Sequence, residues 1–456
     1  MRGHFFLARS PMSSIYRVAC ARRRRRMYAS SHVSTRARED PARSGVIAAG
    51  PAVTPAPPAH GGTRFGIIGA VSFVHLLNDM MQSVIITIYP LLKSEFALSF
   101  VQIGMITLTF QLTASLLQPL VGMVSDRRPL PYSLPVGMCF TLSGLLMLSV
   151  APSYPLVLVS VALIGCGSSV FHPESSRIAR MAAGGRYGLA QSLFQIGGNT
   201  GQALGPLLAA AIILKLGRSR ADWFALPALL SIVILLQVSR WYRRHIDARA
   251  KKTAASERPR FPAPVVRRTI GILLVLMFSK FFYLASISSY YEFYLIQRFG
   301  LSAHASAHLL AVFLFAVAAG TLIGGPFGDH IGRKRVIWFS ILGCAPFTLL
   351  LPYVGLGWTV ALSVVIGLVL ASAFPAIIVY AQDMLTNRIG MVSGLFYGFS
   401  FGMGGLGAAV LGLLADHFGI DFVYKVCAFL PLLGLFAALL PDVRPPEELH
   451  TAAAST

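Results

Sequence analysis

The sequence predicts an all-α integral membrane protein, with twelve transmembrane helices arranged as two six-helix bundles. Its composition is one reason, because 55% of the residues are hydrophobic and only 12% are charged, whereas a soluble domain carries about 25% charged residues. Apolar stretches of roughly 20 residues, the length of a membrane span, also follow one another from Phe65 to Pro441. The two halves of this region, finally, repeat each other's glycine and acid spacing. Lipid offers no partners for backbone groups, so such stretches must be helices or closed barrels, and they are too uniformly apolar for barrel strands.

Short polar breaks separate the predicted spans. With the N-terminus in the cytoplasm, the inner loops carry 18 lysines and arginines and the outer loops carry 5. Cytoplasmic loops are the ones that carry such an excess, so both termini are expected in the cytoplasm. The twelve spans are predicted near 66–91, 101–124, 132–151, 155–174, 187–214, 222–240, 269–296, 304–327, 335–352, 357–380, 390–415 and 422–440.

The N-terminal segment is strongly basic, with eleven arginines in residues 1–63, including the run Arg22 to Arg26. Nucleic-acid binding or a transit peptide would use such a segment. No aromatic interleaving or nucleic-acid fold follows it, so we interpret it as a disordered cytoplasmic tail, or as residues upstream of a mis-annotated start. The predicted domains are this tail over 1–63, a six-helix bundle over 64–240, a cytoplasmic linker over 241–268, a second bundle over 269–442 and a C-terminal tail over 443–456.

The two predicted bundles share sequence patterns. Gly122-x-x-x-Asp126 follows the second span, and Gly325-x-x-x-Asp329 follows the eighth span 203 residues later. Glycines of the fifth span recur in the eleventh at an offset of 206, as Gly198 and Gly404 do. Two related bundles imply a substrate site between them, near the middle of the membrane.

The loop after the eighth span reads GPFGDHIGRKR from Gly325 to Arg335 and resembles the loop signature of the major facilitator superfamily. Its acid, Asp329, can accept charge-assisted hydrogen bonds from a facing basic group or helix N-terminus, and so act as a latch for one gating state. The alternative is that its basic residues simply anchor an inner loop. The first copy is degraded, because Pro129 follows its two arginines. The predicted gating residues of the two copies are Gly122, Asp126, Arg127, Gly325, Asp329, Gly332, Arg333 and Lys334.

The fifth span contains GGNTGQALGP, which ends at Pro206. Small residues every four positions, such as Gly201 and Gly205, let helix backbones approach closely, and a proline can kink the helix. The string resembles the antiporter motif of drug:proton exporters, although Leu207 and Leu208 replace the usual glycine pair. Gating and simple packing both remain open for these residues.

Four longer stretches resemble bacterial inner-membrane exporters of that superfamily that give resistance to a phosphonate antibiotic. They are residues 75–83, 102–111, 168–177 and 286–291. The resemblance covers nearly everything from Phe65 to Asp442. It implies efflux of a small anionic phosphonate in exchange for protons.

Ionisable side chains inside spans are costly and are therefore functional candidates. Asp79 lies near the middle of the first span, and His75 lies four residues before it on the same face. We predict Asp79 as the proton carrier with His75 as its partner, or else a structural pair that locks helices together. His172 and Glu174, at the inner end of the fourth span, are predicted as an inner gate or second proton site, unless they belong to a solvated loop.

The seventh span supplies the opposite charge through Lys280. Its tyrosines fall with this lysine within roughly a 100° arc of the helix, and a cation beside phenol donors suits an anionic phosphonate. The alternatives are a permanent pair of Lys280 with Asp79, and a tyrosine packing stripe. The predicted substrate-binding residues are Lys280, Tyr283, Tyr290, Tyr291, Asn78, Gln82 and Gln111.

Other chemistries find no support in the sequence. None of the five cysteines forms a CxxC pair, so no metal site is predicted. Neither a nucleotide-binding loop nor a catalytic motif occurs, and we therefore predict no ATP, no other cofactor and no enzyme activity. The expected partners are a small-molecule substrate, protons and the lipid bilayer, and the expected state is a monomer. Uptake of a small anionic metabolite and a non-transporting sensor remain as alternative functions.

Overall fold

The computed structural model of the chain describes residues 62–252 and 261–442. The predicted C-terminal tail and almost all of the predicted N-terminal tail lie outside these ranges. Within them every regular element is a helix. The elements are α1 (Phe65–Thr87), α2 (Tyr89–Glu95), α3 (Phe100–Gln111), η1 (Leu112–Leu116), α4 (Leu117–Arg127), α5 (Ser133–Val150), α6 (Tyr154–Ala182), α7 (Tyr187–Ala209), η2 (Ala210–Leu214), η3 (Arg218–Phe224), α8 (Ala225–Lys252), α9 (Ala263–Phe299), α10 (Ala303–Ile331), α11 (Arg333–Leu342), α12 (Ala345–Leu350), η4 (Leu351–Tyr353), α13 (Leu356–Ala371), α14 (Ala373–Met384), α15 (Ile389–Phe418), α16 (Ile420–Cys427) and η5 (Leu430–Leu439).

Eleven helical stretches of the described residues are long and apolar enough to cross a membrane. Several consist of consecutive elements, such as Gln102–Arg127, which runs through α3, η1 and α4. Of the predicted spans, the one over 187–214 is not among the eleven. It corresponds to α7 and η2, and the amides of α7, such as Gln191 and Gln202, lower its hydropathy. Polar side chains in a helix that lies among other helices mark it as a part of the protein interior rather than of the lipid surface.

Helix ends differ from the predicted ones most at the linker. α8 continues to Lys252 and α9 begins at Ala263, so helix extends into the range 241–268 from both sides. The apolar pattern ends near 240, but a helix needs no apolar side chains where it leaves the membrane. Elsewhere the ends have local causes: Ser99 and Gln102 form a capping box at the start of α3, and Gly300, in the left-handed region, ends α9.

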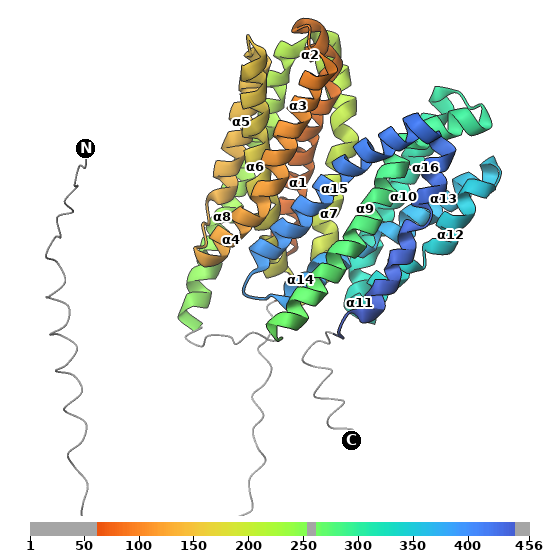
Figure 1. The fold of residues 1–456 in the computed structure, drawn as a ribbon. Coiled ribbons are helices and arrows are strands. Elements are labelled where there is room, and N and C mark those ends of the chain that lie inside the picture. Colours follow the sequence, from red (N-terminus) through yellow and green to blue (C-terminus); the bar gives the residue numbers. More distant parts are fainter. Residues whose placement is uncertain (1–61, 253–260, 443–456) are drawn as a thin grey trace, which may run out of the picture. The chain divides into compact units, whose positions relative to one another are not determined.

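The helices form two groups, which we call the first group (α1 to α8) and the second group (α9 to η5). Within the first group α1 packs on α7 and α5 packs on α6, and within the second group α10 packs on α13 and α9 on α15. Figure 1 shows α15 running from the second group to the lower end of α4. Contacts of α15 with α4 and α6, and of α10 with α7, join the two groups.

The outer surface is apolar. Large hydrophobic side chains such as Phe315 and Val150 are 78% and 72% exposed, respectively. A soluble protein does not present such a surface over most of its helices. Polar and charged side chains are instead buried, among them His75, Asp79, His172, Glu174 and Lys280, as expected for a protein whose solvent is lipid.

Candidate functional site

Asp79 is at the centre of a buried cluster of three titratable side chains. It lies on α1 and is 2% exposed, and the rings of His75 and His172 are fully buried beside it. One carboxylate oxygen is 3.5 Å from Nε2 of His75, on the same helix. The other is 3.5 Å from Nε2 of His172, on α6. The donor atoms of all three lie within 4.8 Å of one another, so the packing of α6 on α1 adds a second imidazole to the predicted pair.

Main-chain carbonyls fix the orientation of both imidazole rings. Nδ1 of His75 lies 2.7 Å from the carbonyl oxygen of Phe194, and Nδ1 of His172 lies 3.1 Å from that of Ser168. A carbonyl oxygen only accepts hydrogen bonds, so each Nδ1 carries a hydrogen and donates it. The neutral ring then turns a bare Nε2 lone pair toward the carboxylate of Asp79.

The two Nε2 atoms and the carboxylate of Asp79 would be stabilised by a positive charge between them. Neither Nε2 atom has a hydrogen-bond partner among the described residues. Two lone pairs that face a carboxylate repel it unless a proton or another cation lies between them. A proton is one such cation, and proton coupling by Asp79 and His75 stays a prediction.

Three amides complete the surroundings of the carboxylate. Asn78 donates to Asp79 over 3.0 Å, and Gln202 of α7 donates over 2.9 Å. The amide of Gln82 lies at 3.5 Å. Asn78 and Gln82 were predicted to bind substrate, and the structure has both hydrogen-bonding to Asp79. Gln202 was not predicted, because the string that contains it was interpreted through its glycines.

Those glycines bring α7 onto α1. A Cβ atom on Gly198 would lie 2.5 Å from Nε2 of His75, and one on Gly201 would lie 2.2 Å from the carbonyl oxygen of Leu76. Gly205 meets Ser83 in the same way, at 2.5 Å. Close approach of the two backbones is thus what these positions require, and it places Gln202 against Asp79.

The predicted acid of the first loop motif connects the two groups. Asp126, at the end of α4, accepts hydrogen bonds from the backbone N–H groups of Gly390 and Met391, at 2.9 and 2.8 Å. These two residues begin α15 in the second group. Arg177 of α6 forms an ion pair with the same carboxylate. We call this arrangement the Asp126 latch.

The second copy forms a related contact in the opposite direction, which we call the Asp329 latch. Asp329, near the end of α10, accepts hydrogen bonds from the N–H groups of Gly188 and Leu189, at 2.9 and 3.0 Å. These residues begin α7 in the first group. Each carboxylate faces the N-terminus of a helix, where partial positive charge and free N–H groups favour an anion. We call the end of the molecule that carries both latches the latch end.

The glycines of the loop motifs make these contacts possible. A Cβ atom on Gly122 would lie 2.1 Å from the carbonyl oxygen of Gly390, and one on Gly325 would lie 2.0 Å from that of Gly188. Gly332 has a φ of +93° between α10 and α11, a conformation that a glycine adopts without strain. The repeated Gly-x-x-x-Asp pattern therefore produces two related close approaches between the groups.

A further network at the latch end was not predicted. Asp383 of α14 forms ion pairs with Arg333 and, across the two groups, with Arg180 of α6. Gln382 accepts a second hydrogen bond from Arg180 over 3.2 Å. The other predicted basic residues lie farther out: Arg127 is exposed, and Lys334 is 3.6 Å from Asp442.

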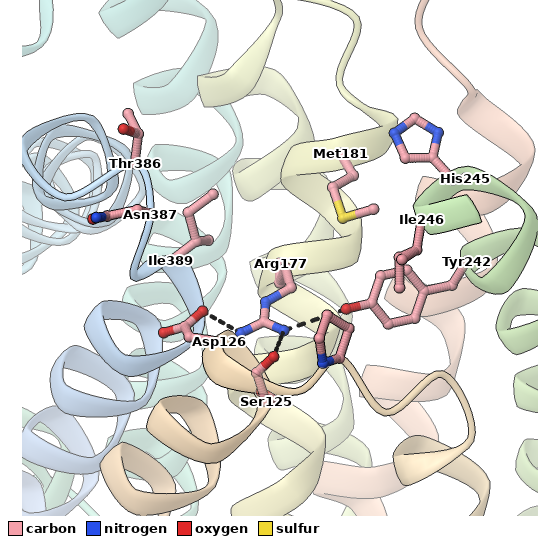
Figure 2. A pocket seen from close by; sticks show the side chains of 11 residues that line it. Ser125, Asp126, Arg177, Met181, Tyr242, His245, Ile246, Thr386, Asn387 and Ile389 are labelled. Atoms are coloured by element: carbon pink, nitrogen blue, oxygen red, sulfur yellow. Dashed lines mark hydrogen bonds and ion pairs between the residues drawn. The ribbon is translucent and has the colours of Figure 1, made fainter. Parts of the chain in front are cut away.

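Figure 2 shows a cavity of about 600 Å³ at the latch end, with Arg177 pointing between Asp126, Ser125 and Tyr242. The guanidinium donates to the Tyr242 hydroxyl over 3.3 Å and lies 3.4 Å from the carboxylate of Glu174. Glu174 is fully buried, and its second oxygen has no partner among the described residues. It was predicted as an inner gate or second proton site, or else as part of a solvated loop, and the structure has it inside the protein rather than in solvent.

Lys280 lies in the second group, apart from Asp79. Its ammonium group donates to the carbonyl oxygen of Ala371 over 3.3 Å and lies 5.1 Å from the centre of the Phe374 ring. Within the described residues it has no ion pair, so the considered Lys280–Asp79 pair is absent from this conformation. Phe374 in turn contacts Tyr397, whose ring lies against His172.

The tyrosines of α9 separate into two sets. Tyr291 donates to Ser363 over 3.1 Å, and Tyr283 is buried in the same core of the second group. Tyr290 donates to the carbonyl oxygen of Ala408 on α15. Gln111 of α3 faces α15 as well, because a Cβ atom on Gly405 would lie 3.1 Å from its amide nitrogen.

Comparisons with known proteins agree with this fold. The family model described as Major Facilitator Superfamily matches residues 71–319 and 273–455. The fosmidomycin resistance protein of Escherichia coli (strain K12) is 65% identical over 384 residues, which are 84% of this chain and 94% of that protein. An uncharacterized transporter of this type from Bacillus subtilis (strain 168) is 39% identical over 394 residues, 86% of this chain and 96% of the relative. The resemblance predicted from the four sequence stretches is confirmed.

Solved structures share the fold at low sequence identity. The transporter FucP, in its outward conformation, aligns with a TM-score of 0.66 at 14% identity, over 83% of this chain and 99% of FucP. The human organic anion transporter TETRAN aligns with a TM-score of 0.63 at 17% identity, over 82% and 99% of the two chains. At these identities the similarity concerns the fold alone.

Proposed function

Because this chain belongs to the Major Facilitator Superfamily of membrane transporters, we propose that it exports fosmidomycin, or a related small anionic phosphonate, in exchange for protons. The observation that carries the proposal is the 65% identity, over 94% of its length, to a protein named for resistance to this compound. The buried proton cluster supports the exchange part of the proposal. The family and the solved structures with this fold are membrane transporters, so the proposal includes no enzyme activity.

The proposed proton site is Asp79 with His75 and His172. A proton taken up from outside the cell would neutralise the carboxylate or charge an imidazole, and its release inside would complete the exchange. Glu174 is proposed as a second proton site, because its buried carboxylate pairs with Arg177. Arg177 in turn lines the cavity at the latch end. The proton gradient then supplies the energy, so no nucleotide is needed.

The proposed substrate contacts lie between the two groups. Lys280 is a buried cation without an acidic partner among the described residues, which suits a phosphonate anion. Gln111 and Tyr290 reach α15 from either side and are proposed to contact the substrate as well. Tyr283 and Tyr291 are proposed to support α9 from inside the second group.

We further propose that the latch end faces the cytoplasm of a bacterial inner membrane. Described basic residues such as Arg177, Arg180 and Arg333 lie there, as the positive-inside rule requires of a cytoplasmic side. Both termini would then be cytoplasmic. With α7 and η2 counted as a span, the helices would number twelve in two bundles, and the chain is proposed to act as a monomer.

Fosmidomycin accumulation in an efflux-deficient bacterial host tests the proposal. The strains compared carry no transporter, the wild-type chain, or the Asp79→Asn variant at matched expression, each with and without a protonophore. Asparagine keeps the size of Asp79 and one acceptor oxygen for the neighbouring amides, but it cannot titrate. We expect low accumulation for the wild type, and high accumulation with the variant or with protonophore.

Each other result selects a different account. Efflux by Asp79→Asn at the wild-type rate would refute Asp79 as the proton carrier, and His75 or Glu174 would be examined next. Wild-type accumulation equal to that of the empty host would remove fosmidomycin as a substrate. Uptake of a small anionic metabolite, or a sensor without transport, would then replace export.

A further inference from the structure

We propose that His172 is the residue through which proton uptake opens the latch end, an inference that rests on the proposed proton exchange and deepens it. His172 contacts the proton site and the opposite helix group at once. Its Nε2 lies 3.5 Å from Asp79. Its ring centre lies 5.3 Å from that of Tyr397 and 5.0 Å from that of Phe401, both on α15.

With both imidazoles neutral, the cluster carries the single negative charge of Asp79. A first proton, taken to lie between Asp79 and His75 of the same helix, cancels that charge. This leaves the cluster neutral, and a second proton goes to Nε2 of His172 and gives it one net positive charge.

The groups that face His172 come from three helices. His75 and Asp79 on α1 are titratable, as is Tyr397 on α15, while α7 contributes uncharged amides such as Gln202, which reaches Asp79. Ser168 of α6 itself completes the surroundings. Among these groups no acid lies beside His172 except Asp79, so nothing in its described contacts compensates a second proton.

His172 contacts residues of its own helix group and residues of the second helix group. Asp79, His75 and Ser168 lie in the first group with His172, and they move with it when the two groups rock as rigid bodies. Tyr397 and Phe401 lie in the second group, and α15 leaves α6 when the latch end opens. A proton shifts a conformational equilibrium only through interactions that differ between the two states, and for His172 these are the two aromatic rings and the water that replaces them.

Two opposing effects decide the direction. The aromatic faces attract an imidazolium, which favours the closed state. Burial of an uncompensated charge disfavours the closed state, in which the His172 ring has no exposed surface. This penalty exceeds the attraction of an aromatic face for a cation. The second proton therefore favours the open latch end, where water reaches His172. The proton taken up from outside would then itself expose the site to the cytoplasm.

The test is the conformational equilibrium of the purified, substrate-free protein as a function of pH. Spin labels are placed at Arg128 and Arg335, which are exposed at the latch end of the first and second groups, in a background without the native cysteines. Distances are measured by electron–electron double resonance between pH 8 and pH 5, with a chelator present so that protons are the only cations titrated. For the wild type we expect the closed-to-open ratio to fall about tenfold, or about 1.4 kcal/mol.

Variants separate His172 from the rest of the cluster. In His172→Gln, whose amide can offer an N–H to Asp79 but cannot gain a proton, we expect the pH response to shrink to less than about twofold. Phe401→Leu should reduce it as well, because water then reaches His172 in the closed state. Phe396→Leu, five residues earlier on α15 and outside the ring contacts described for His172, should leave it unchanged.

A full pH response in His172→Gln, no response in the wild type, or equal responses in the two phenylalanine variants would overturn the inference. If His172→Gln does not fold, the phenylalanine pair still decides. Because no substrate is present, these outcomes are independent of the accumulation assay. A chain that exports by proton exchange without this response contradicts the role of His172 alone, whereas a chain that does not export contradicts the proposed function.

Discussion

The Asp126 latch allows a quantitative prediction for the variant Asp126→Asn. The carboxylate has two oxygens, and each accepts one backbone N–H of α15, at 2.9 and 2.8 Å, while Arg177 pairs with the same group. An asparagine retains one oxygen. Its NH2 group then faces the second backbone N–H, so that one hydrogen bond is replaced by a contact between two donors.

The magnitude follows from the bond that is lost. A hydrogen bond to a charged group contributes about 1.5–3 kcal/mol, and the loss of a negative charge at the start of α15 adds about 0.3–1 kcal/mol. Together these shift the equilibrium between the closed and open latch end by roughly 2–4 kcal/mol, or about 30-fold or more. Asp126 and α15 separate when the latch end opens. The substitution therefore raises the free energy of the closed conformation and leaves that of the open conformation unchanged.

Distances between labels at Arg128 and Arg335 measure the effect at neutral pH. The matched control is Asp416→Asn, which removes an exposed carboxylate near the other end of α15 and should leave the distances unchanged. We expect the closed population to fall sharply in Asp126→Asn alone. A closed-to-open ratio within twofold of wild type would refute the latch as the element that holds this conformation.

Three further outcomes are expected. Gly198→Ala should destabilise the chain by about 1–3 kcal/mol and abolish efflux, because its Cβ would lie 2.5 Å from His75, whereas Gly404→Ala, with no atom within 4 Å, should match wild type in melting temperature and efflux. The guanidinium of Arg218 donates two hydrogen bonds to Glu95 and holds its pKa below the usual value; its stabilisation is present above about pH 4.3 and is lost as the pH falls through the lowered pKa. The advantage of wild type over Glu95→Gln in melting temperature, small for so exposed a pair, should therefore shrink steadily as the pH falls below about 4.3, and a constant advantage would contradict this. Lys280→Gln should weaken fosmidomycin export at least tenfold while Asp79 still exchanges protons, and unchanged export would remove Lys280 from the substrate site.

Spacing along one helix could be predicted from the sequence, and contacts between helices mostly could not. His75 and Asp79 are four residues apart, so helical geometry alone puts them on one face. The Gly-x-x-x-Asp pattern likewise indicated a latch at Asp329, whereas the degraded first copy gave no equal expectation for Asp126. His172 and Gln202 reach Asp79 only because α6 and α7 pack on α1, and Asp383 meets Arg180 across the two groups.

The face of α9 shows the same limit. A helical wheel correctly groups Lys280 with the tyrosines, but it does not give the direction in which that face points. The structure turns Tyr283 and Tyr291 into the second group, and the carbonyl of Ala371 and the Phe374 ring contact Lys280. Likewise the sequence of 187–214 predicted a span but not which neighbours its amides would meet, and the structure gives α1 and α15.

Proton-coupled export is tested most directly with the purified chain in liposomes, by following fosmidomycin and protons together. A proton gradient is imposed, labelled fosmidomycin is supplied on the opposite side, and both fluxes are recorded for wild type and for Asp79→Asn. We predict that fosmidomycin accumulates on the proton-rich side beyond equal concentrations as protons move the other way, and that both movements are lost in the variant. Fosmidomycin flux that is the same with and without the proton gradient, and the same in wild type and variant, would contradict the account.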